Sequence, residues 1–345
     1  MLPMAGVDGL RVGGAAHEAL LYPGRGMTQA IEQSDATRLL RAYQAQEKQF
    51  VERRFPLRFA VEVPAIRELY SQAKGLRWNP ETDIAWDRLD VEAYAADVRE
   101  AARLTWSRRA WGTYPGLGEN TALLVRLCLE SGALGMDAKL FLSFRPAEEA
   151  KHLETCYLLA ERLGGYLADP ANPALQKASN HPFAQAALDR DLPVEAFVAA
   201  LGTLDDQLDL NLDLARLQLT RNEVVRQALR LMASDKQRHV LFAWAFLGSR
   251  IGGLDARGRE AVVEAVRGLL ERVILAGYRN TWLLPAASRE PWLGAEEKTA
   301  AQGLGAADTP AERRMLRATV AQLRERLAVW GLELPVVSHP ELGSV

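Results

Sequence analysis

Two five-residue stretches carry the side chains best suited to chemistry in this chain. Residues 148–152 read Glu-Glu-Ala-Lys-His, and residues 235–239 read Asp-Lys-Gln-Arg-His. On a helix, residues three apart project from one face, so Glu149 and His152 can share a metal ion. This Glu-x-x-His unit builds carboxylate-bridged two-metal sites in four-helix bundles. In the second stretch Lys236 stands where the first has Glu149, and an ammonium group has no lone pair for a metal.

A carboxylate lies 30 residues before each of these two positions. Glu119 precedes Glu149 by that distance, and Asp206 precedes Lys236 by the same distance. Such a separation fits the path along one helix, through a short turn and back along an antiparallel neighbour. The spacing therefore predicts five metal ligands: Glu119, Glu149, His152, Asp206 and His239.

The segments around these residues have helical periodicity, and none alternates as a strand does. Helices are expected over residues 27–53, 65–74, 91–111, 119–131, 137–163, 194–219, 222–251, 255–277 and 311–330. Gly112, Pro115 and Gly116 predict a break, and Pro146 predicts a kink or a break. Asn222 is expected to cap its helix. The fold class is therefore all-α, and the two similar helix pairs indicate an internally duplicated bundle.

Composition excludes several classes of protein. Apolar residues make up 48% of the 345 residues and charged residues 25%, which allows a large core. The net charge of −2 offers no basic surface, so we expect no nucleic-acid partner. No run of about 18 apolar residues predicts a membrane span. The first 20 residues lack the pattern of a signal peptide, so the expected location is the cytoplasm.

The motif segments resemble the ferritin-like, ribonucleotide-reductase-like di-iron oxidase and oxygenase superfamily. The resemblance covers roughly residues 65–250, and its clearest part is 148–154, where the family pattern is acid-Glu-x-Arg-His. It implies a ferritin-like four-helix bundle core with extra N- and C-terminal helices. The expected parts of this single structural domain are an N-terminal arm and helix (1–64), the metal-binding bundle (65–253) and a C-terminal helical extension (254–345).

The resemblance also implies a function and a set of roles. Glu119, Glu149 and His152 would bind one metal ion, with Glu149 able to bridge, and Asp206 and His239 would serve a second ion. Glu148 and Asp235 would accept hydrogen bonds that orient the two imidazoles. The implied activity is that of a non-haem iron oxidoreductase, with one or two ions of iron, or manganese instead. It would activate dioxygen as co-substrate to oxidise a small-molecule substrate. An external electron donor and a homodimer are expected from the same resemblance.

Lys236 departs from the family pattern, which has a bridging glutamate at this position. Three carboxylates and one ammonium balance one divalent ion rather than two. Lys236 could pair with Asp206 or Glu149 beside a single ion, lose its proton beside two ions, or replace the ions altogether. We favour reduced or altered metal content, with Lys236 as a catalytic residue that tunes charge, donates a proton or holds a substrate anion.

Two other functions and one other register stay open. The chain could be a metal-free, non-catalytic protein in which Lys236 forms a buried salt-bridge cluster with the former ligand carboxylates. It could also be a metal-dependent enzyme of non-redox chemistry that uses Lys236 as base or nucleophile. If the helix is rotated so that Lys236 faces solvent, Asp235 and His239, four residues apart, would form the inward pair instead.

Overall fold

A computed structural model describes residues 58–130 and 135–345, which belong to one compact unit, Arg54–Val345. The expected arm and the expected helix over residues 27–53 lie outside the described residues. Within them, no helix combines the length and the apolarity needed to cross a bilayer.

Helices make up most of the described chain, and the expected all-α class is confirmed. They are α4 (Pro64–Gly75), α5 (Ala96–Leu129), α6 (Met136–Leu142), α7 (Arg145–Arg162), α8 (Pro173–Ser179), α9 (Phe183–Leu188), α10 (Val194–Val198), α11 (Asp206–Leu219), α12 (Glu223–Arg250), α13 (Ala256–Leu269), α14 (Trp292–Ala301) and α15 (Thr309–Ala328). The strands are two-residue segments, β1 (Ser338–His339) and β2 (Gly343–Ser344), paired antiparallel.

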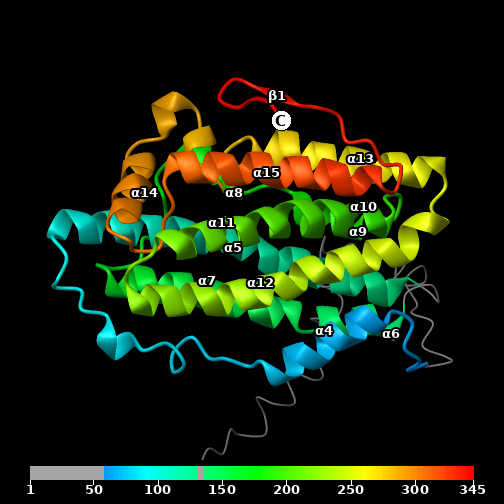
Figure 1. Cartoon of the computed structure of the whole chain (residues 1–345), viewed down its shortest axis with the longest axis horizontal. Coiled ribbons are helices and arrows are strands. Elements are labelled where there is room, and N and C mark those ends of the chain that lie inside the picture. Colours follow the sequence, from blue (N-terminus) through cyan, green and yellow to red (C-terminus); the bar gives the residue numbers. More distant parts are fainter. Residues whose placement is uncertain (1–57, 131–134) are drawn as a thin grey trace, which may run out of the picture. The chain divides into compact units, whose positions relative to one another are not determined.

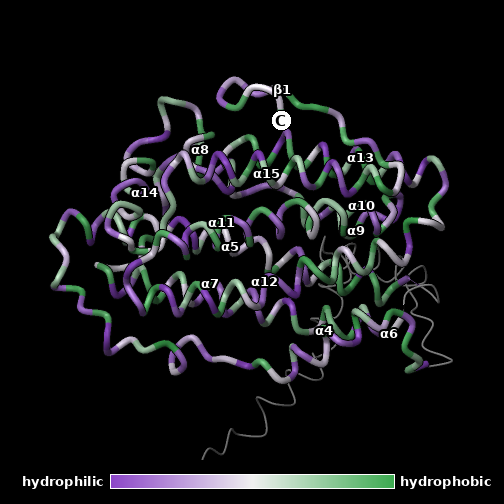
Figure 2. The backbone as a smooth tube through the Cα atoms, viewed as in Figure 1, coloured by the Kyte–Doolittle hydropathy of each residue, from purple (hydrophilic) through white to green (hydrophobic). Residues whose placement is uncertain are grey.

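Four helices form the bundle that positions the candidate site. α5 packs against α7, and α11 packs against α12, which also contacts α7. In Figure 1, α13 and α15 lie above α10 and α11, and α7 and α12 lie below them. Hydrophilic and hydrophobic residues alternate along these helices, as Figure 2 shows, because each helix buries one face in the bundle. This arrangement places four helices around a shared interior.

The predicted break at Gly112–Gly116 is wrong, because α5 continues through Pro115. Pro115 lacks the N–H that would bond the Trp111 carbonyl four residues earlier, and its ring crowds the preceding turn. Residues outside the helix donate hydrogen bonds to that turn. The Tyr278 hydroxyl and the Arg279 guanidinium donate to the Gly112 carbonyl at 2.8 and 3.1 Å. The site-bearing part of α5 is therefore continuous with its N-terminal half.

The single helix expected over residues 137–163 is interrupted at Ser143 and Phe144. Pro146 lies in the first turn of α7, where a missing N–H breaks no intrahelical bond. The proline therefore marks a helix start rather than a kink. By contrast, the predicted cap is confirmed, since the Asn222 side chain accepts hydrogen bonds from the N–H groups of Val224 and Val225.

The helix expected over residues 194–219 contains a π-helical segment, η2 (Ala199–Asp205), which ends immediately before Asp206. Such segments are frequent at functional sites because they shift the register of the following side chains. Within η2, a Cβ added to Gly202 would lie 2.2 Å from the Cβ of Ala243. Gly202 and Ala243 lie one helical turn from Asp206 and His239, respectively. Their close approach therefore brings α11 and α12 together beside these two residues.

We expect Gly202→Ala to separate the two helices and to lower the free energy of unfolding by about 2 kcal/mol. The matched control is Gly248→Ala in α12, where an added Cβ would make only an ordinary contact at 3.7 Å. Chemical denaturation of both variants measures the difference. Equal stability of the two variants would show that the helices separate without cost.

Candidate metal centre

Three buried residues from three helices converge in the bundle interior. Glu149 of α7, Asp206 of α11 and His239 of α12 each offer a ligand atom, and these atoms lie within 4.8 Å of one another. All three side chains are buried. Two carboxylates and one imidazole form a donor set that suits iron and manganese.

Each imidazole is held at one nitrogen by an acid and turns the other nitrogen toward Glu149. His239 Nε2 lies 2.7 Å from Glu148 Oε2, and His152 Nε2 lies 3.2 Å from Asp235 Oδ2. The Nδ1 atoms of His239 and His152 lie 3.4 and 3.6 Å from the two oxygens of Glu149. The Glu149 carboxylate therefore sits between the two free nitrogens.

Both Nδ1 atoms are buried, and among the described residues neither has a hydrogen-bond partner. If Nε2 carries the proton that bonds to the acid, the Nδ1 lone pair faces a carboxylate, and a proton or a cation between them removes the repulsion. Burial alone lowers the pKa of His152, but Asp235 and Glu149 outweigh it and raise that pKa to about 9. The residues present thus fit a metal ion at this position.

Asp235 is saturated by donors from several directions. Trp78 Nε1 donates to Asp235 Oδ2 at 2.9 Å, and Lys151 Nζ lies 3.0 Å from the same oxygen. Arg238 donates to the other oxygen of Asp235 and, at 2.6 Å, to Glu148. Both oxygens of Asp235 already have donors, and Asp235 is not one of the three converging residues. It is therefore placed to orient His152.

Arg145 supplies a positive charge inside the group itself. Its Nη2 lies 2.8 Å from Asp206 Oδ2 and 3.7 Å from Glu149 Oε1, and its side chain is 1% exposed. Burial raises the pKa of Asp206, and Arg145 counteracts this rise. One of the two carboxylate charges is therefore already partly neutralised without a metal.

Lys236 contacts two acids of α11 that differ from the expected partners. Its Nζ lies 2.7 Å from Asp209 Oδ2 and 2.5 Å from Asp213 Oδ2, rather than on Asp206 or Glu149. Burial alone lowers the pKa of Lys236, but these two carboxylates raise it above its usual value. The lysine is buried, so the solvent-facing register does not describe its position. The two carboxylates beside it favour the ammonium form over a neutral lysine.

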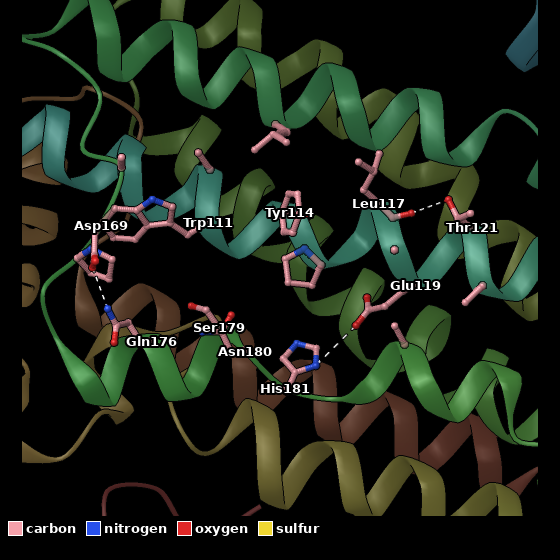
Figure 3. A pocket seen from close by; sticks show the side chains of 18 of the residues that line it. Trp111, Tyr114, Leu117, Glu119, Thr121, Asp169, Gln176, Ser179, Asn180 and His181 are labelled. Carbon is pink, nitrogen blue, oxygen red and sulfur yellow. Dashed lines mark hydrogen bonds and ion pairs between the residues drawn. The ribbon is translucent and has the colours of Figure 1, made fainter. Parts of the chain in front are cut away.

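Glu119 is buried but is not among the three converging residues. Its Oε1 lies 3.7 Å from His181 Nδ1. Figure 3 marks this contact with a dashed line. Burial and the nearby Asp205 raise the pKa of Glu119 to about 8. His181 is not among the residues predicted from the sequence, because a lone histidine in a proline-containing loop has no periodic pattern that could identify it.

A cavity of about 1000 Å³ opens on the side of α5 that carries Glu119. Residues of α5, α7, the segment after α7, α8, α9 and the loop between α8 and α9 line it, including Trp111, Tyr114, Asn180 and His181 (Figure 3). Cavities of this size hold small organic molecules.

Gly116 separates the cavity wall from the metal centre. A Cβ added at this position would lie 3.1 Å from both Cδ and Oε2 of Glu149. We expect Gly116→Ala to displace the Glu149 carboxylate and to weaken metal binding about tenfold, as for other residues that orient a ligand. Gly118→Ala is the matched control, since an added Cβ there would meet nothing within 4 Å. Anaerobic titration with Fe(II) measures both affinities, and equal values would refute the role of Gly116.

Comparison with known proteins shows similarity in structure only. No family model matches the chain, and no curated protein matches it. Solved structures of R2-like ligand-binding oxidases do match. One with an aerobically reconstituted metal cofactor after photoconversion is 16% identical with a TM-score of 0.57. A single-site variant with an aerobically reconstituted Mn/Fe cofactor is 16% identical with a TM-score of 0.56. Each alignment covers 76% of this chain and 92% of the other.

At this identity the similarity establishes a common fold. The expected ferritin-like, R2-like fold is therefore confirmed. The expected domain boundaries, the individual ligand roles and the homodimer stay predictions.

Proposed function

We propose that this chain is a metal-dependent oxidase that binds iron, or manganese instead, at Glu149, Asp206 and His239. The observation that carries the proposal is the pair of buried Nδ1 atoms facing Glu149 without hydrogen-bond partners among the described residues. The Mn/Fe cofactor named for the structurally similar R2-like oxidase adds support from the fold. The metal would supply the redox chemistry with dioxygen, and the substrate would be a small organic molecule in the adjoining cavity.

The protein residues would hold and orient the ion. Glu148 and Asp235 would fix the imidazoles of His239 and His152 with Nδ1 toward the centre. Glu149 would be able to bridge toward a second ion at His152, with Glu119 as the predicted further ligand. Because Glu149, Asp206 and His239 converge whereas Glu119 lies outside that group, we propose that an ion at these three residues binds more tightly than any second ion at His152.

Lys236 is assigned a structural role within this proposal. An ammonium group held by the carboxylates of Asp209 and Asp213 is a poor base and a poor nucleophile, because deprotonation would remove a counter-charge from both acids. The non-redox function that relies on Lys236 therefore has little support from the geometry. The cytoplasmic location and the external electron donor stay predictions.

A metal-free protein is the second candidate, and Arg145 favours it. Its guanidinium contacts both Asp206 and Glu149, so it could serve as the counter-charge for the two acids. This candidate predicts a stable, folded chain whose thermal stability does not change when iron is added.

Metal analysis of the full chain decides between the two candidates. We expect about one tightly bound ion per chain after anaerobic addition of Fe(II), with a rise in Tm. The reduced, loaded protein should then consume dioxygen in an oxygen electrode. Metal content no higher than that of a Glu149→Gln variant would overturn the proposal. Binding without oxygen uptake would overturn the oxidase and leave a non-redox metal protein.

A further inference from the structure

The large cavity and the metal centre share one wall. Pro115, Leu117 and Glu119 of α5 line the cavity, while Gly116 between them lies against Glu149. Only the backbone of one helical turn therefore separates a molecule in the cavity from the Glu149 carboxylate. This position suits a substrate, because a reacting group at the inner end would lie close to the metal.

The cavity walls are mostly apolar and aromatic. Trp111, Tyr114, Leu153 and Leu188 contribute to them. The described residues that line the cavity include two acids, Glu119 and Asp169, and no lysine or arginine. An anionic ligand would find no counter-charge among these lining residues and would face two carboxyl groups. No favourable interaction would therefore offset the free energy of removing its charge from water.

His181 lies at the inner end with unused hydrogen-bonding capacity. Its side chain is 6% exposed, and its ring packs edge-on against Tyr278 at 4.5 Å, which fixes its orientation. Among the described residues, neither ring nitrogen has a hydrogen-bond partner. A buried polar group without a partner costs about 1–3 kcal/mol, so a ligand that pairs with it gains affinity.

We propose that this cavity binds the substrate, and that the substrate is a mainly apolar molecule with an uncharged hydroxyl or amide group. The 3.7 Å between His181 Nδ1 and Glu119 Oε1 is too long for a direct hydrogen bond. One hydroxyl oxygen beside both atoms both donates and accepts, so it completes the pair. The assignment of this ligand as substrate rests on the proposed oxidase, whereas its binding does not require the metal.

Three probes with the same ring test the chemical class. Tryptophol, tryptamine and indole-3-acetate carry an indole with an alcohol, an amine or a carboxylate. Calorimetric titration of the full chain, both metal-free and loaded with Mn(II), measures each affinity. We expect tryptophol to bind at least about tenfold more tightly than indole-3-acetate, whose carboxylate would meet two carboxyl groups and no counter-charge in the lining, and more tightly than tryptamine. Tighter binding of the amine or the carboxylate, or no binding of any probe, would overturn the proposal.

Variants of His181 test the contact. His181→Phe keeps a ring of similar size without nitrogens, and we expect it to weaken tryptophol binding at least about fivefold. His181→Gln restores a donor and an acceptor and should retain most of the affinity, provided that it folds as the wild type does by circular dichroism. His339→Phe, a histidine outside this cavity, is the matched control. Unchanged affinity in His181→Phe would refute the contact.

The outcome is separable from that of the proposed function. If Fe(II) binds but tryptophol does not, the substrate class is wrong and the metal centre stands. If tryptophol binds through His181 but no metal binds, the cavity stands as a ligand site and the oxidase fails.

Discussion

Replacing Glu149 with glutamine is expected to abolish tight metal binding. Its two oxygens face the Nδ1 atoms of His152 and His239, and it is one of the three converging ligands. Changes to residues that merely orient ligands cost about 10- to 100-fold in affinity, so loss of this ligand should cost more than about 100-fold. Metal content and Fe(II) titration under anaerobic conditions measure the loss.

The control for this change lies on the same helix. Glu154→Gln removes a carboxylate one turn and a half further along α7 and lies outside the converging group. It should bind Fe(II) as the wild type does. In the metal-free state, Glu149→Gln also removes the negative charge shared by two histidines, so the pKa of His152 should fall from about 9. Undiminished metal content in Glu149→Gln would place the metal elsewhere.

Replacing Lys236 with methionine is expected to destabilise the chain without abolishing metal binding. The ammonium is the counter-charge of Asp209 and Asp213. Lys236 and Asp213 are buried, and the Asp209 side chain is 14% exposed. Removing one partner of a buried ion pair typically costs about 3 kcal/mol or more, because a buried charge is left uncompensated. Arg109 and Arg216 also contact Asp213, so the loss of unfolding free energy should stay near about 3 kcal/mol.

Chemical denaturation measures this loss, and Lys177→Met, an exposed lysine on α8, is the control. Removing one acid as well, in Lys236→Met/Asp213→Asn, should restore part of the stability. A catalytic lysine predicts the opposite pattern, with normal stability of Lys236→Met and complete loss of oxygen consumption. That pattern would refute the structural role.

Local sequence determined the helical architecture and the relative placement of Glu149 and His152. Helical periodicity identified the all-α class, and the Asn222 cap is confirmed where the sequence placed it. The three-residue spacing of Glu149 and His152 alone puts both on one face, because the rise and turn of a helix leave no other arrangement. These features depend on neighbours within a few residues, so they can be predicted from the sequence.

Tertiary structure decided which partner each charged residue meets. The sequence led us to pair Lys236 with Asp206 or Glu149, whereas it meets Asp209 and Asp213. Sequence spacing cannot tell which of Asp206, Asp209 and Asp213 the lysine meets. All three lie on α11, and a lysine side chain is long enough to reach across more than one helical turn. The π-helical segment before Asp206 also shifts the register of the side chains that follow it, and no local sequence pattern predicted this shift.

Long-range packing also decided what surrounds the site. Tyr278 and Arg279 donate to the Gly112 carbonyl, in the turn before Pro115, from 166 and 167 residues away, and α5 continues where its glycines and proline predicted a break. His181 reaches Glu119 because the loop between α8 and α9 folds over α5. Sequence alone thus determined which residues could bind a metal, while the packing of helices distant in sequence decided which of them converge, because buried charges take the partners that the fold places within reach.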